Sequence, residues 1–162
     1  MLLQIYTIIH TIISLIGIFT GLVALNGLLA GKRLDGWTKW FLITTTLTSV
    51  TGFFFPFRGF TPAIGVGIIS MIVLVVAIYA RYSKHLVGAW RWIYVITANI
   101  ALYFNCFVLV VMLFRRVPAL HALAPAQTEP PFQHTQLVVL AIFVVLTIIS
   151  LIKFKVEPVT RP

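Results

Sequence analysis

The chain opens with a long uncharged stretch, from Leu2 to Ala30, that contains no Asp, Glu, Lys or Arg. About 20 apolar residues are enough for a helix to cross the hydrocarbon core of a bilayer. Inside lipid the backbone must satisfy its own hydrogen bonds, and a single segment can do so only as a helix. The stretch therefore predicts a membrane-spanning helix, long enough to tilt or to extend past the bilayer.

Four further apolar stretches approach the same length. The predicted spans are residues 2–30, 40–57, 62–80, 90–114 and 135–152, and the one long connection is an outer loop at 115–134. Only 9% of the residues are charged and 60% are hydrophobic, whereas a soluble domain carries about 25% charged residues. We predict an all-α fold, a single integral-membrane helical bundle that occupies residues 1–162 and has five transmembrane helices.

The basic residues predict the orientation of this bundle. One set of loops and the tail hold Lys32, Arg33, Lys39, Arg81, Lys84, Arg91, Lys153, Lys155 and Arg161, and the opposite loops hold Arg58, Arg115 and Arg116. Because basic loops stay in the cytoplasm, the N-terminus is predicted outside and the C-terminus inside. Four spans would remove this asymmetry. Trp37, Trp40, Trp90 and Trp92 fall at the predicted inner interface, as expected of aromatic anchors.

The net charge of +9 follows from the same asymmetry and requires no nucleic-acid partner. A basic inner face is expected to attract membrane lipids with anionic headgroups, at about 1 kcal/mol per Lys or Arg near the surface.

Small and polar residues recur along one face of the first span: Thr7, His10, Ser14, Gly17, Gly21 and Ala24. A spacing of three or four residues places them on one side of a helix, and small residues allow two helices in lipid to approach closely. Similar positions occur in the third and fourth spans. We predict helix-packing roles for Ser14, Gly17, Gly21, Gly67, Asn99 and Asn105.

Three histidines and a glutamate are predicted on the outer side, and they leave two interpretations open. In the first, His10 together with His134 or His121 binds haem b, or His10, His121, Glu129 and His134 bind a metal ion, since histidine is a common ligand of both. In the second, His10 is a hydrogen-bonded packing residue and the loop histidines are solvated.

No nucleotide-binding, hydrolase or metalloprotease motif is present, and a single cysteine, Cys106, excludes an intrachain disulfide and a CxxC site. The absence of charge in the middle of the spans argues against an ion-coupled transporter. The first hypothesis is a non-enzymatic accessory or assembly subunit that contacts other membrane subunits or a second copy of itself. The alternatives are a haem- or metal-binding redox protein and, more weakly, a small-solute channel or carrier lined by the Thr-rich second span.

Three stretches resemble small polytopic membrane proteins of proteobacteria that have no assigned function. They are Gly88 to Tyr94 (GAWRWIY), Leu47 to Phe53 (LTSVTGF) and Leu120 to Pro125 (LHALAP). The resemblance extends over most of the chain and implies a multi-pass location in the bacterial inner membrane. It implies no activity, cofactor or set of ligands.

Overall fold

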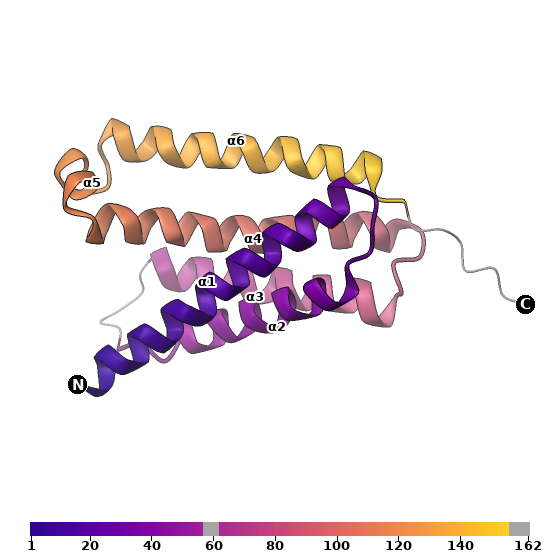
Figure 1. Cartoon of the computed structure of the whole chain (residues 1–162), viewed down its shortest axis with the longest axis horizontal. Coiled ribbons are helices and arrows are strands. Elements are labelled where there is room, and N and C mark those ends of the chain that lie inside the picture. The colour runs from indigo at the N-terminus through magenta and orange to yellow at the C-terminus, as the bar shows by residue number, and fades with distance from the viewer. Residues whose placement is uncertain (57–61, 156–162) are drawn as a thin grey trace, which may run out of the picture.

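The computed structural model of the chain describes residues 1–56 and 62–155, and all regular structure within them is helical, which confirms the predicted all-α class (Figure 1). The elements are α1 (Leu2–Leu29), α2 (Asp35–Gly52), α3 (Pro62–Ile78), a π-helix η1 (Tyr79–Ser83), α4 (Ala89–Arg116), α5 (Pro118–Leu123) and α6 (Pro130–Lys153).

The five long helices lie side by side, with α1 crossing the others at an angle (Figure 1). The end of α1, the start of α4 and the end of α6 meet at one end of the bundle, and the N-terminus and α5 lie at the other. Arg91 near the start of α4 donates a hydrogen bond to the carbonyl of Phe154, directly after α6. Successive helices therefore run in opposite directions, as short connections between them require.

Within residues 1–56 and 62–155, four helical segments are long and apolar enough to cross a membrane: Leu2–Leu29, Ile64–Ser83, Ala89–Arg116 and Pro130–Lys153. They correspond to four of the five predicted spans and give the chain the composition of a multi-pass membrane protein. Of the long helices, α2 is not among these four segments. It contains Asp35, Lys39 and seven hydroxyl side chains within its 18 residues, so its crossing of the membrane stays a prediction.

The ends of two helices differ from those predicted. The second was expected at residues 40–57, but α2 begins at Asp35, a carboxylate in the first turn where the helix dipole favours it, and ends at Gly52. The fifth was expected from Thr135, but α6 begins at Pro130. Proline suits the first turn of a helix because the amide hydrogen it lacks has no partner there. The connection predicted at 115–134 is therefore shorter, and it contains α5.

A close helix contact lies where α1 meets α2 and α4. A Cβ atom added to Gly21 would lie 2.6 Å from Leu102 Cδ1 and 2.8 Å from Phe41 Cδ2. At Gly17 the added atom would lie 3.3 Å from the hydroxyl oxygens of both Thr44 and Thr45. The small face of α1 is therefore used inside the chain along this half of the helix, where it brings three helices together.

Replacing Gly21 with Leu tests this contact. The new side chain would overlap Phe41 and Leu102, and overpacking of this kind costs about 1–3 kcal/mol or more. We expect a lower midpoint of thermal unfolding, followed by tryptophan fluorescence in detergent micelles. Gly36→Leu is the matched control because an added Cβ at Gly36 meets no atom within 4 Å. Equal midpoints for the two variants would contradict the proposed contact.

Candidate functional site

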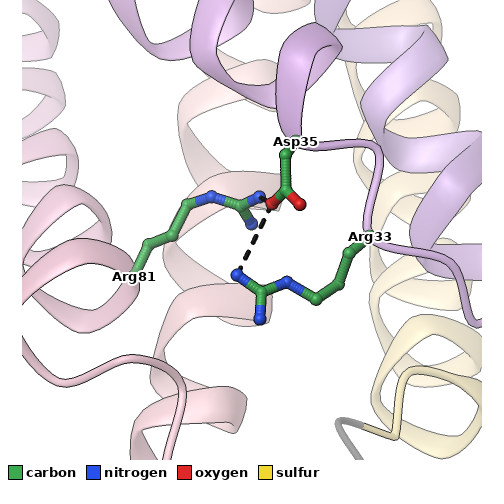
Figure 2. A network of polar contacts seen from close by, with 3 residues as sticks. All are labelled: Arg33, Asp35 and Arg81. Atoms are coloured by element: carbon green, nitrogen blue, oxygen red, sulfur yellow. Dashed lines mark hydrogen bonds and ion pairs between the residues drawn. The ribbon is translucent and has the colours of Figure 1, made fainter.

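A buried arginine joins α2 to η1 at the basic end of the bundle (Figure 2). The Arg81 guanidinium donates a hydrogen bond to Asp35 Oδ1, and its side chain is 3% exposed. Its central carbon lies 5.2 Å from the centroid of the Tyr94 ring on α4. A buried charge needs a partner and hydrogen bonds to offset its lost hydration. Asp35 supplies the opposite charge, and the Tyr94 ring supplies a second favourable contact.

Asp35 also faces a second cation. Arg33 Nη2 lies 3.5 Å from the same Oδ1 atom, but the Arg33 side chain is 43% exposed, so water screens this pair (Figure 2). The sequence predicts Arg81 in a loop because the apolar run stops at Ala80. The π-helical turn carries the helix on to Ser83 and turns Arg81 inward. A π-helical turn has no characteristic spacing of apolar residues by which the sequence could reveal it.

The connection from η1 to α4 has an unusual backbone. His85 and Leu86 have φ values of 50° and 60°, in the left-handed region that costs residues other than glycine about 1–3 kcal/mol. Leu86 is 1% exposed, and its amide donates to the Ala80 carbonyl at 3.1 Å. Burial of Leu86 offsets the strain and fixes the course of the chain. Beside it lies an open cavity of about 530 Å³ lined by Leu86, Gly88, Ala89, Arg91 and Trp92.

At the opposite end of the bundle, His10 connects α1 to α2. Its Nδ1 lies 2.8 Å from Thr51 Oγ1. The Thr51 hydroxyl also lies 2.6 Å from the Leu47 carbonyl, to which it donates. The Phe55 ring packs edge-on against both His10 and Tyr6, with centroids 5.0 and 4.9 Å away. This geometry matches the interpretation of His10 as a packing residue.

The other residues predicted on the outer side do not join His10. His121 on α5 and His134 in the first turn of α6 are exposed, and the start of α6 lies apart from the start of α1 (Figure 1). The carboxylate oxygens of Glu129 accept from the amides of Ala126 and Thr128, at 3.0 and 2.9 Å. These hydrogen bonds, that from Ala126 above all, lower the pKa of Glu129.

The residues that the structure describes include no group of three or more His, Cys, Asp or Glu that could hold a metal ion. The predicted metal site of His10, His121, Glu129 and His134 is therefore not formed. The physical reason is that α1 crosses the bundle at an angle, which separates its first turns from α5 and α6 (Figure 1).

Two of the polar residues predicted to pack, Asn105 and Asn99, lie on α4. Asn105 Nδ2 donates to Thr45 Oγ1 at 3.1 Å, which joins α4 to α2. Asn99 is 3% exposed and donates to the Val95 carbonyl within its own helix. The remaining two lie elsewhere. Ser14 donates to the His10 carbonyl at 2.7 Å, and a Cβ on Gly67 would lie 3.1 Å from the Phe53 ring.

Comparison of the chain with protein-family models, curated proteins and solved structures finds no match. The resemblance to proteobacterial membrane proteins stays a prediction.

The Arg81 pair predicts unequal effects for two neutralising substitutions. Asp35→Asn leaves the buried Arg81 charge without its carboxylate, while Arg33→Gln removes only the exposed partner of Asp35. Because Asp35 itself is 65% exposed, we expect a loss of about 1–3 kcal/mol for Asp35→Asn, less than for a fully buried pair. For Arg33→Gln we expect less than about 1 kcal/mol. Chemical unfolding in micelles measures both, and an equal loss would refute the role of Arg81.

Proposed function

We propose that this chain is a non-enzymatic accessory or assembly subunit of a larger membrane complex, and that it acts through helix contacts within the bilayer. The observation that supports the proposal most is the uneven packing of α1. None of residues 2–16, all of which the structure describes, is buried, whereas Gly17, Thr20, Gly21, Ala24, Leu25, Gly27 and Leu28 are. The start of α1 contacts α2 through Tyr6 and His10, and the other faces of this half are available to another helix.

The exposed half of α1 suits a contact in lipid. Its hydroxyl groups bond to the carbonyls of their own helix, Thr7 to Leu3, Thr11 to Thr7 and Ser14 to His10, at 2.7–2.8 Å. These groups are therefore already satisfied. The large apolar side chains of the same half, such as Ile9 and Ile12, are 51% and 52% exposed. A partner helix would gain van der Waals contact here without breaking a hydrogen bond.

The geometry favours the alternatives less. The Thr-rich face of α2 packs against Gly17 through Thr44 and Thr45, so this part of the face is filled and does not line a pore. The His10 ring packs against Phe55 and bonds to Thr51, and the exposed His134 and His121 lie near the start of α6 and on α5. The haem and metal hypotheses therefore lack converging ligands.

We further propose that α2 also crosses, so that the chain spans a bacterial inner membrane five times with its N-terminus outside. An 18-residue helix is about 27 Å long, close to the roughly 30 Å of a bilayer core. Its two ends pair with opposite ends of the bundle, Asp35 with Arg81 and Thr51 with His10. Its polar Thr45 bonds inward to Asn105, which makes the low hydropathy of α2 compatible with a crossing.

A photo-crosslinking residue at Ile9 tests the accessory role in native membranes. We expect one discrete adduct with a different membrane protein, identified by mass spectrometry, and its loss when Ile12 is replaced by Trp. The matched control is Ile72 on α3, which is 60% exposed and should give no discrete adduct. A self-adduct would replace the accessory role by self-association, and equal labelling from both positions would refute the proposal.

Single cysteines in a Cys106→Ala background test the topology. Five crossings place Lys32 and His85 on the cytoplasmic side and Ala126 outside, so an impermeant thiol reagent applied to intact cells should label only Ala126→Cys. If α2 did not cross, Lys32 and His85 would lie on opposite sides of the membrane. Labelling of one of these two cysteines and protection of the other would therefore contradict five spans.

A further inference from the structure

We propose that the open cavity at the junction of η1 and α4 binds the headgroup of an anionic phospholipid, with the Arg91 guanidinium as its cation. Leu86, Gly88, Ala89, Arg91 and Trp92 line this cavity, which has a volume of about 530 Å³. The proposal does not depend on the accessory role, since residues at the start of α4 line the cavity, and this end of α4 lies at the other end of the bundle from the start of α1 (Figure 1).

The cavity lies at the level where headgroups are found. It follows the segment Ile64–Ser83 and opens at the start of Ala89–Arg116, both long and apolar enough to cross a membrane. The short connection between two such helices lies at the membrane surface. Trp92 is 56% exposed, and Tyr79 and Tyr82 on the adjoining η1 are 45% and 49% exposed. Amphipathic aromatic side chains of this kind favour the headgroup region.

The charge around the cavity favours an anion. Among the described residues, this end of the bundle carries Lys32, Arg33, Lys39, Arg81, Lys84, Arg91, Lys153 and Lys155, with Asp35 as its carboxylate. Asp35 is engaged by Arg81 and does not line the cavity. Arg91 directs one nitrogen to the Phe154 carbonyl, which holds the guanidinium in place at the cavity wall. A guanidinium has five N–H donors, so donors remain for a phosphate oxygen.

The apolar surroundings favour a lipid over a free phosphate ion. The cavity is bordered by Leu86 and Trp92, and Val87 in the same connection is 69% exposed. These side chains offer a surface for the glycerol and the upper part of an acyl chain, while Arg91 takes the phosphate. A small inorganic anion would contact Arg91 but not the apolar side chains.

The test measures binding of phosphatidylglycerol to the full chain in detergent by native mass spectrometry. Ala89→Glu places a carboxylate in the cavity at an exposed position in the first turn of α4, where the helix dipole favours it, so the fold is retained. One like charge at the surface is worth about 1 kcal/mol, which corresponds to about fivefold weaker binding.

Gly36→Glu is the matched control. It adds the same charge in the first turn of α2, into open space and outside the cavity, and it should change binding less than twofold. Ala89→Gln should bind like the native chain. Equal weakening by Ala89→Glu and Gly36→Glu would show a diffuse charge effect and overturn the site. Displacement of the lipid by equimolar inorganic phosphate would assign the cavity to a free anion instead.

A second measurement uses the unmodified cavity. In nanodiscs made of equal parts of phosphatidylglycerol and phosphatidylcholine, bromine is placed on one lipid or on the other. We expect brominated phosphatidylglycerol to quench tryptophan fluorescence more strongly, and we expect Trp92→Phe to remove this difference. Equal quenching by the two brominated lipids in the native chain would refute the preference for the anionic headgroup.

Discussion

The close approach of α1 to α2 and α4 at Gly21 is the contact on which the rest of the bundle depends. Lipid tails are as apolar as the side chains, so burying an apolar side chain between two helices gains no hydrophobic free energy. Helices in lipid therefore associate through close packing and through hydrogen bonds between polar groups. Gly21 allows Phe41 and Leu102 to lie against the α1 backbone. One turn away, Gly17 makes room for the threonine hydroxyls of α2, one of which accepts a hydrogen bond from Asn105. Close packing and an interhelical hydrogen bond therefore occur at the same level of the bundle.

The two ends of the bundle are held by different chemistry. At the basic end, Arg81 with Asp35 and Arg91 with the Phe154 carbonyl join elements far apart in the sequence. At the other end, hydrogen bonds of Tyr6 and His10 with Thr51 hold the start of α1 on α2. The contacts between distant elements therefore involve charged side chains at the first end and hydroxyl and imidazole groups at the second.

The uneven packing of α1 gives the bundle two distinct surfaces. Where α1 crosses α2 and α4 it is buried, and toward the N-terminus it contacts α2 and exposes its other faces. These exposed faces support the proposed contact with another membrane subunit. The opposite end, with its cavity beside Arg91 and Trp92, supports the proposed contact with lipid headgroups. A protein-facing surface and a lipid-facing site can therefore act independently of each other.

The sequence by itself determined the helical class, four of the long apolar helices and the small-residue face of α1, because hydrophobic length and three-to-four-residue spacing are local properties. It also identified the tryptophans and the basic residues that lie near the starts of α2 and α4. Only the tertiary structure decided that Gly21 meets Phe41 and Leu102 within the same chain, that Arg81 turns inward to Asp35, and that His10 meets Thr51 rather than the other histidines. Each of these depends on the crossing angle of α1 or on the π-helical turn at η1. Neither leaves a periodic signal, since both arise from side chains that meet across helices distant in the sequence.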